Sequence, residues 1–592
     1  MNIRSDRRSL RALYGLLLAV ASLPLHATTW YVRPGGGTRY STNVTSGQCD
    51  GKADAPYPGS GVNQHCAFKD ARMLWQDGSY TSGTTFPSWG WVGAGGDTYI
   101  IKGSLAEGVS YRVGWNNGTK YDGWGITGNA SSSGVPVPPS GTPTQHTRIL
   151  GGNYASCHSA LARTQLHGGW GVFAVLNLYG AQYVDVACLD ITDFSACGRA
   201  SQAVTCDSKQ DFAQNGVMFS NTSTNDTLTD IRIHGLASFG IYGPTGDGVI
   251  MDHVDILGNA GGGWNADASD GKTGKGSLLV QHYDISWNGC AEEYPIVHPL
   301  PYGDCTDQDH GGYGDGFGTS STDSEPPGWQ VHFDQGTVSY NTQDGLDALH
   351  IGGKGSSMTV THTLAFSNMG QQIKVGGATA TITDSYIVGN CSAMSHPIPG
   401  TPPKYNAKLD LFCRAGDTAV VVMVPDAQPA VFQHNILYSN NHVGLEIEYP
   451  GTPSPAAAIK YDNNIFIGFP NSEGNQPSPI YSNTDLKMFT NRGASFSNNV
   501  TYRAKRGWTC PATWLHEVAG SCDDPHLKDE TWHPYGYGDS SPATPAKNGS
   551  SQKEPASPHG SYAAVAAGSL GAAGLITGLW RGVRYLRSRT RV

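Results

Sequence analysis

The chain has 592 residues, of which 78 are glycine, and only 15% of its positions are charged. This length exceeds what one compact core normally supports, so we expect several domains or one elongated repeat. The formal net charge of −10 argues against a nucleic-acid partner, because phosphate binding needs a basic surface. An acidic substrate would have to be met by local lysine or arginine side chains, or by a bound cation.

The N-terminus has the pattern of an export signal. Four arginines between positions 4 and 11 precede a mostly apolar stretch over residues 12–25, which the ending Leu25-His26-Ala27 follows. We predict a signal peptide over residues 1–27 and a protein that is secreted, periplasmic or on the cell surface. A buried helix is the alternative interpretation of this stretch.

The twelve cysteines agree with an oxidising compartment. None of them has the CxxC spacing that is typical of a zinc site. We predict disulfides between neighbours along the chain, namely Cys49–Cys66, Cys157–Cys188, Cys197–Cys206, Cys290–Cys305, Cys391–Cys413 and Cys510–Cys522.

The segment after the signal predicts the capped end of a solenoid, which must hide its terminal core. We expect an entry strand at residues 30–32, a short amphipathic cap helix over 66–75 and a first coil at 95–102. This order of elements resembles the start of exported β-helix polysaccharide lyases. The resemblance implies a fold much more than a particular chemistry.

A short apolar strand that ends in asparagine recurs along the chain. The recurring residues are Asn259, Asn288, Asn341, Asn368, Asn390 and Asn440. Their separations of 29, 53, 27, 22 and 50 residues indicate coils of 22–29 residues. In the two large gaps, one coil either lacks its asparagine or carries an insertion. Asparagine suits a corner because it tolerates left-handed backbone and can hydrogen-bond in stacks.

The strands alternate apolar and polar residues, and no long helical pattern separates them. Both features disfavour a βαβ architecture, and a propeller would need repeats of about 40 residues or more. We therefore predict an all-β fold, a right-handed parallel β-helix over residues 28–535.

Two neighbouring coils hold the residues that could perform chemistry. Aligned on their asparagines, these coils place Asp344 over Gln371 and Asp347 over Lys374, since each pair is 27 residues apart. Equivalent positions of adjacent parallel strands lie about 4.8 Å apart. One coil earlier, Asp315 precedes Asp344 by 29 residues. We predict that three carboxylates and one lysine meet on one face of the helix.

Grouped carboxylates are suitable ligands for Ca²⁺. A lyase that acts on a uronic acid must acidify the proton beside the substrate carboxylate and then remove it. Ca²⁺ can neutralise that carboxylate, and a lysine that is partly buried or near a cation can have a lowered pKa and act as the base.

This pattern resembles that of family 9 pectate lyases over about residues 310–390. The resemblance implies that Asp344 and Asp347 are Ca²⁺ ligands, with Asp315 as an upstream ligand, and that Lys374 is the catalytic base. Gln343 stands where the family has another aspartate, which removes one negative charge from the predicted site.

Several further residues are weaker candidates. His350 follows Asp347 by three residues and could serve as a base, with a structural role as the alternative. Glu446 continues the register of Asp347 and Lys374. The residues that we expect to contact substrate are Gln371, His310, Glu446 and Arg492.

The C-terminus differs in composition from the rest of the chain. Residues 536–560 have linker composition, rich in serine, proline, glycine and lysine. The segment 561–592 combines an apolar stretch of small residues with a terminal arginine cluster. We predict a membrane anchor or a processed sorting tail there, with a surface helix as the alternative.

Three functions are compatible with these patterns. The first is a secreted lyase that cleaves an acidic polysaccharide by Ca²⁺-assisted β-elimination. The second is a glycoside hydrolase that uses pairs of the same aspartates as acid and base or nucleophile. The third is a non-catalytic glycan-binding protein of the cell surface.

Overall fold

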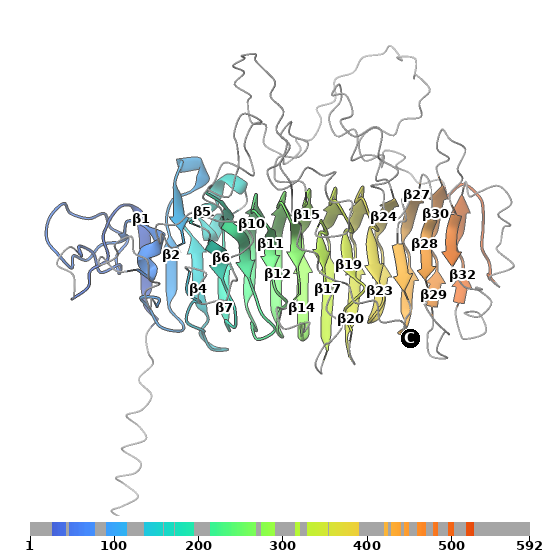
Figure 1. The fold of residues 1–592 in the computed structure, drawn as a ribbon, viewed down its shortest axis with the longest axis horizontal. Helices are drawn as coiled ribbons and strands as arrows, with labels where there is room; N and C mark the ends of the chain where they lie inside the picture. Colours follow the sequence, from blue (N-terminus) through green and yellow to red (C-terminus); the bar gives the residue numbers. More distant parts are fainter. Residues whose placement is uncertain are drawn as a thin grey trace, which may run out of the picture. The chain divides into compact units, whose positions relative to one another are not determined.

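The computed structural model describes residues 27–525 with interruptions. The residues outside this description are 1–26, 43–46, 77–89, 115–134, 158, 171, 195–212, 268–273, 290–313, 320–327, 353–354, 390–419, 424–427, 440–442, 449–458, 469–477, 483–494, 503–516 and 526–592. The described chain is an all-β, right-handed parallel β-helix, as predicted. Its strands follow one another from β1 (Thr29–Gly37) to β33 (Val500–Tyr502), and each lies beside its equivalent in the next coil (Figure 1).

The strands form two parallel sheets. One has ten strands: β6 (Val172–Asn177), β9 (Ala213–Met218), β11 (Phe239–Tyr242), β13 (Gly262–Asn265), β16 (Phe317–Gly318), β19 (Leu346–Ala348), β22 (Ile373–Val375), β25 (Val420–Met423), β28 (Val443–Glu448) and β31 (Ser478–Ser482). The other has 23: β1, β2 (Thr98–Ile101), β3 (Ser110–Val113), β4 (Thr147–Gly151), β5 (Thr164–Gly168), β7 (Val184–Ala187), β8 (Leu189–Asp193), β10 (Thr227–His234), β12 (Val249–Leu257), β14 (Gly276–Gln281), β15 (Asp284–Ser286), β17 (Trp329–Asp334), β18 (Thr337–Ser339), β20 (Ser357–Thr361), β21 (Leu364–Phe366), β23 (Thr379–Thr383), β24 (Tyr386–Gly389), β26 (Ala430–Gln433), β27 (Ile436–Ser439), β29 (Ile459–Asp462), β30 (Ile465–Gly468), β32 (Ser495–Ser497) and β33.

Apolar side chains of successive coils stack inside the helix. In β17, Trp329, Val331 and Phe333 point inward and are at most 1% exposed, whereas Gln330 and His332 between them face outward. This alternation follows from the period of two in a strand. Each coil thereby buries one face against its neighbours and leaves the other free to carry polar groups.

The recurring asparagines form a buried ladder at one corner of the helix, which confirms the predicted stack. The side-chain amides of Asn259, Asn288 and Asn341 each donate to Oδ1 of the next asparagine at 2.8–2.9 Å. The ladder continues to Asn368 and ends on Gln372, whose Oε1 accepts the amide of Asn368 at 2.8 Å.

The structure corrects two details of this corner. The left-handed backbone belongs to the residue before the asparagine, with φ of 62° at Trp287 and 55° at Tyr340, so asparagine supplies hydrogen bonds there rather than an unusual φ. The two large gaps are single coils with insertions, because β15 pairs directly with β18 and β24 pairs directly with β27. Asn390 and Asn440 lie outside the described residues.

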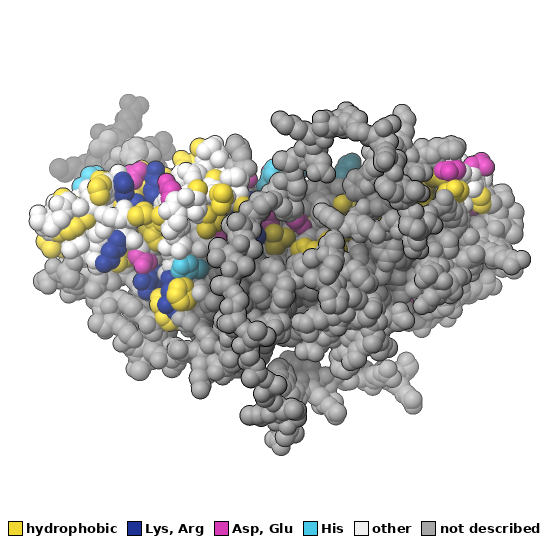
Figure 2. Space-filling view, turned by 90° about the horizontal axis from the view of Figure 1, so that it is seen from above, with side chains coloured by type: hydrophobic (Ala, Val, Ile, Leu, Met, Phe, Trp, Pro, Cys, Tyr) yellow, Lys and Arg dark blue, Asp and Glu magenta, His cyan; other side chains and the backbone are white. Residues whose placement is uncertain are grey.

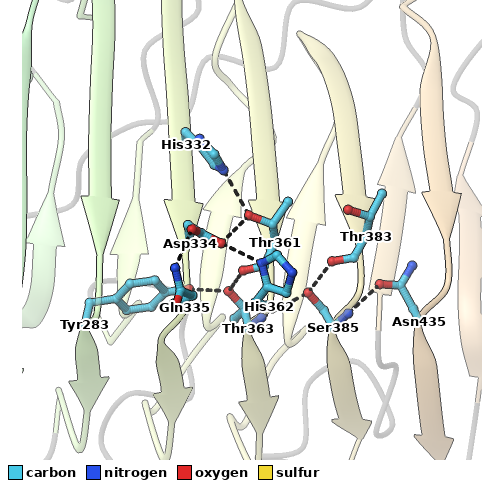
Figure 3. A network of polar contacts seen from close by, with 10 residues as sticks. All are labelled: Tyr283, His332, Asp334, Gln335, Thr361, His362, Thr363, Thr383, Ser385 and Asn435. Atoms are coloured by element: carbon cyan, nitrogen blue, oxygen red, sulfur yellow. Dashed lines mark hydrogen bonds and ion pairs between the residues drawn. The ribbon is translucent and has the colours of Figure 1, made fainter.

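A second corner joins the two strands that each coil contributes to the larger sheet, and Figure 3 shows part of its polar column. The backbone N–H of Thr363 donates to Oγ of Ser385, and the N–H of Ser385 donates to Oδ1 of Asn435, both at 3.1 Å (Figure 3). A second asparagine ladder then runs from Asn435 through Asn464 to Asn499. This ladder was not predicted.

At the N-terminal end, the predicted entry strand is present and the predicted cap helix is shorter than expected. Strand β1 pairs in parallel with β2, the first full coil. The cap helix expected over 66–75 is wrong in extent, because Phe68 forms parallel bridges with β1 and keeps that segment extended. Only the 3-10 turn η1 (Ala71–Leu74) remains, capped by the side chain of Asp70. The other turns are η2 (Leu105–Glu107), η4 (Tyr154–Ser156) and η5 (Ala160–Ala162).

Two of the predicted disulfides are confirmed, Cys49–Cys66 and Cys157–Cys188. Both fit an oxidising, extracellular compartment. Each of the other four predicted pairs includes at least one residue outside the described part of the chain. Almost the whole predicted signal peptide, the linker and the C-terminal tail also lie outside it. Within the described part, no helix is long and apolar enough to cross a membrane.

Candidate catalytic and metal site

Three short strands of the ten-stranded sheet, β16, β19 and β22, position the predicted site. In β19, Leu346 and Ala348 point into the core, and Asp347 between them points outward. Lys374 has the same place in β22, between two buried aliphatic residues. The core-facing residues thus fix the direction of the polar ones. On the face seen from above, acidic and basic side chains come into view near the middle of the described surface (Figure 2).

Asp347 and Lys374 are direct partners in the parallel register, as predicted. The Nζ atom of Lys374 lies 3.1 Å from Oδ2 of Asp347 and 3.2 Å from Oδ2 of Asp344. The contact with Asp344 was not predicted, because the register places this residue over Gln371. A lysine side chain is long enough to reach it diagonally. One ammonium group therefore bridges two carboxylates.

Asp315, Asp344 and Gln371 form a column along the three coils, which confirms the predicted register. The backbone N–H of Asp344 donates to Oδ1 of Asp315 at 3.0 Å, and that of Gln371 donates to Oδ1 of Asp344 at 2.7 Å. The N–H of Leu349 donates to Oδ1 of Asp347 at 2.9 Å. One oxygen of each carboxylate is thus held by backbone, and Oδ2 of Asp344 and of Asp347 is turned toward Lys374.

The glycine after each of the first two aspartates is required by close packing. A Cβ atom on Gly316 would lie 2.5 Å from the carbonyl oxygen of Gly345, and one on Gly345 would lie 2.4 Å from that of Gln372. Both would also press on side-chain amides of the asparagine ladder. The repeated Asp-Gly pair therefore marks the point at which the ten-stranded sheet meets the ladder.

The cluster holds an excess of negative charge in a poorly solvated place. Asp344 is 3% and Asp347 is 8% exposed. Burial, followed by repulsion from these two carboxylates, raises the pKa of Asp315 well above its usual value. Burial, followed by repulsion from Asp344, raises the pKa of Asp347 to about 6. With all groups ionised, three negative charges face one positive charge.

Asp344 and Asp347 also raise the pKa of the lysine, because their negative charges favour its charged form. Burial by itself would lower the pKa of Lys374, but Asp344 and Asp347 outweigh it and raise this pKa above its usual value. The expectation of a lowered lysine pKa is therefore not met while both carboxylates contact Nζ. Lysine acts as a base only where the charge of these carboxylates is neutralised by something else.

The residues of the cluster fit Ca²⁺ by their chemistry. Asp315, Asp344 and Asp347 offer only oxygen donors, which Ca²⁺ prefers in a flexible shell. Two of the Oδ2 atoms converge on the ammonium of Lys374, so a positive charge already occupies their meeting point. Gln343 beside Asp344 is 4% exposed and offers an uncharged amide in place of a further carboxylate.

The other predicted site residues lie farther from the aspartate cluster or outside the described residues. Glu446 in β28 lies in register with Lys374, with Val421 of β25 between them, so their backbones are about 10 Å apart. His350 is exposed in the turn that follows β19. His310 and Arg492 lie outside the described residues. The structure thus brings together five predicted residues, namely Asp315, Asp344, Asp347, Gln371 and Lys374, and places Glu446 along the same row.

Comparison with known proteins gives no family for this chain. No protein-family model matches the sequence, and no curated protein matches it. Among solved structures, the Agl-KA catalytic domain is 12% identical, with 72% of this chain and 60% of that chain covered and a TM-score of 0.36.

Two further structures are lyases by description. An alginate lyase from Paenibacillus sp. str. FPU-7 is 12% identical, covering 66% of this chain and 94% of that chain, with a TM-score of 0.28. A mannuronic acid specific polysaccharide family 6 lyase from human gut microbiota is 10% identical, covering 73% and 87%, with a TM-score of 0.33. Likenesses of this size carry no argument about the activity of this chain.

Proposed function

We propose that this protein is an exported polysaccharide lyase that cleaves an acidic, uronic-acid-containing glycan by β-elimination with Ca²⁺ as its cofactor. The observation that carries the proposal is the contact of one ammonium, Lys374, with both Asp344 and Asp347, while Asp315 stacks on Asp344. A structural ion pair would balance its charges, because an unpaired buried charge is costly. Three carboxylates around one lysine, when all are ionised, leave two negative charges uncompensated, which a divalent cation would balance.

The reaction asks for a base and for charge neutralisation. The base takes the proton from the carbon beside the substrate carboxylate, a double bond forms to the next carbon, and the glycosidic oxygen leaves with the electron pair of the broken C–O bond and takes up a proton. A bound Ca²⁺ would supply neutralisation of the substrate carboxylate. Lys374 would be the base, since its side chain is 19% exposed and is held in place by Asp344 and Asp347.

A screen of acidic polysaccharides, with and without Ca²⁺, tests this function. We expect ultraviolet absorbance from the unsaturated product on a uronic-acid polymer, no signal on a neutral glucan, and loss of the signal on addition of chelator. An absence of this absorbance on every uronic-acid polymer in the presence of Ca²⁺ would contradict the proposal.

One observation favours a glycoside hydrolase as the second candidate. The raised pKa of Asp347, about 6, is suitable for a general acid. Because Asp344 and Asp347 contact the same Nζ atom at 3.2 and 3.1 Å, their Oδ2 atoms are no more than 6.3 Å apart. That separation lies below the range of about 6.5–9.5 Å for inverting enzymes, so such a hydrolase would be retaining. New reducing ends without absorbance, and indifference to chelator, would support it.

A further inference from the structure

The second corner carries a column of residues with left-handed backbone on the outside of the helix. Nine consecutive members have φ between 47° and 59° and follow one another in register: Asp230, His253, His282, Gln335, His362, Asp384, His434, Asn463 and Asn498. Asparagine, aspartate and histidine are the non-glycine residues that adopt this conformation most readily. Backbone geometry therefore accounts for the polar character of the column, but not for the identity of each residue.

His253 and His282 are the two described histidines of this column that stand on adjacent coils, and they share one carboxylate. The Nδ1 atoms of His253 and His282 lie 2.8 and 2.7 Å from the same oxygen, Oδ1 of Asp252. Their rings are stacked, with centroids 4.5 Å apart and an interplanar angle of 24°. The side chains are 57% and 39% exposed, so an ion from solvent can reach them.

These three side chains present two imidazole nitrogens and one carboxylate oxygen to one point. Each offers one ligand atom, and the three atoms lie within 4.8 Å of one another. Two imidazoles with a carboxylate suit zinc or copper, whereas Ca²⁺ prefers oxygen alone. Around a tetrahedral zinc ion with bonds of about 2.0–2.1 Å, neighbouring ligand atoms are about 3.3 Å apart. The Nδ1 atom of each histidine would have to move away from Oδ1 of Asp252 by only about half an ångström to reach this spacing.

We propose that Asp252, His253 and His282 form a binding site for a divalent transition-metal ion of the zinc and copper class. The ion links two consecutive coils, because Asp252 and His253 belong to β12 and His282 follows β14. Three protein ligands leave at least one coordination position for water. The site is separate in sequence and in ligand chemistry from the aspartate cluster around Lys374.

The same column supplies a matched control at His362, which Figure 3 shows. Its Nδ1 lies 2.8 Å from Oδ1 of Asp334, so this histidine also has a carboxylate partner (Figure 3). The neighbours of His362 in the column are Gln335 and Asp384 rather than a second histidine. Thr361 and Gln335 also donate to Asp334. A histidine and an aspartate at the same corner are present here without the histidine pair.

The test is calorimetric titration of Zn²⁺ into the full exported chain, with excess Ca²⁺ present to occupy the oxygen-ligand cluster. The variant is the double substitution His253→Asn and His282→Asn, and the control is His362→Asn. Asparagine occupies this corner at Asn463 and Asn498, so the substitutions preserve the backbone conformation. Circular dichroism and thermal unfolding verify that each variant is folded, and the single variant His282→Asn serves if the double variant is not.

We expect wild type and His362→Asn to bind one more equivalent of Zn²⁺ than the double variant, and His282→Asn to bind that equivalent at least tenfold more weakly. With Cu²⁺ as the probe, electron paramagnetic resonance should show coupling to two nitrogens in wild type and lose it in the double variant. Equal stoichiometry and equal spectra in wild type and the double variant would overturn the proposal. So would an equal loss in His362→Asn.

Discussion

Two polar columns follow the same coils of the helix, and they differ in how their polar side chains are paired. Asn341 and Asp344 are three residues apart. The side chain of Asn341 accepts from Asn288 and donates to Asn368, so both of its polar atoms are engaged by neutral neighbours. Asp344 instead stacks on Asp315, a second carboxylate, and its remaining oxygen contacts Lys374.

The difference is the one expected between a structural column and a functional one. A ladder of neutral amides satisfies every hydrogen bond and stabilises the corner. Stacked carboxylates in a buried place lower stability and shift pKa values, and such arrangements gather at functional sites. We therefore propose that the ladder holds the coils in register and that the aspartate column next to it presents charge to a ligand.

The largest loss of activity is expected from replacing Lys374, the proposed base. Lys374→Ala and Lys374→Arg should each reduce kcat by about 10²–10⁴-fold, the usual contribution of a general base. Arginine keeps the contacts with the two aspartates but does not give up its proton, so Lys374→Arg should retain near wild-type stability. Initial rates from ultraviolet absorbance and thermal unfolding measure both quantities. Full activity of Lys374→Arg would exclude a base role.

Breaking the asparagine ladder should lower stability and leave the catalytic rate nearly unchanged. Asn341→Ala removes the acceptor of the backbone N–H and of one side-chain N–H of buried Asn288, and the side-chain donor to the carbonyl of Ile285. We therefore expect it to lower the free energy of unfolding by about 2–4 kcal/mol. The rate per folded molecule at low temperature should remain close to that of wild type. Denaturant unfolding and active-site-normalised kinetics test this. Unchanged stability would show that the ladder does not hold the coils.

A change of charge in the aspartate column should give a smaller effect that depends on pH. The pKa of Asp315 is raised above its unfolded value of about 3.9, so its stabilising contribution is present below that pH and is lost as pH rises through the folded pKa. Asp315→Asn should therefore be more stable than wild type at pH 8 and close to wild type at pH 4. Thermal unfolding across this range measures the gain.

Asp226 is the matched control for this experiment. It is buried at the start of β10, accepts the N–H of Val184, and has a pKa raised to about 7, mainly by burial. Asp226→Asn should gain stability with rising pH in the same way. Saturating Ca²⁺ should cancel the gain of Asp315→Asn, because wild type is then stabilised by the ion, and should leave the gain of Asp226→Asn unchanged. Equal responses to Ca²⁺ would contradict a specific site.

The smallest effect is expected at Glu446, about two strand spacings from Lys374 along the same row. Loss of one hydrogen bond to a sugar hydroxyl in Glu446→Ala should raise KM by about two- to tenfold and leave kcat near its wild-type value. Glu446→Gln, which can still hydrogen-bond, should recover most of this change. A fall in kcat with unchanged KM would instead place Glu446 in the chemistry.

Much of this arrangement is predictable from the sequence, because a parallel coil converts a residue count into a position. The interval of 27 residues places Lys374 beside Asp347, and 29 places Asp315 beside Asp344. The contact between Lys374 and Asp344 is not predictable in this way, since it depends on the conformation of a long side chain. The direction of the lysine pKa shift depends on that same contact.

Two other features were predicted wrongly or missed, for different reasons. The helical pattern over 66–75 is overridden because Phe68 bridges to β1. The shared carboxylate of His253 and His282 was not recognised because the repeat was followed on its asparagines alone. The corner column lies six residues before the asparagines in several coils, as at His282 before Asn288, and an interval count on histidine and aspartate would have found it.

The central claim is that the aspartate column, unlike the asparagine ladder beside it, is built to bind a ligand. Titration calorimetry of Ca²⁺ into wild type and Asp344→Asn tests it most directly, because asparagine keeps the oxygen that accepts the N–H of Gln371 and removes only the charge. We predict that wild type binds Ca²⁺ and that Asp344→Asn binds it at least tenfold more weakly. Absence of binding to wild type, or equal binding to both proteins, would contradict the claim.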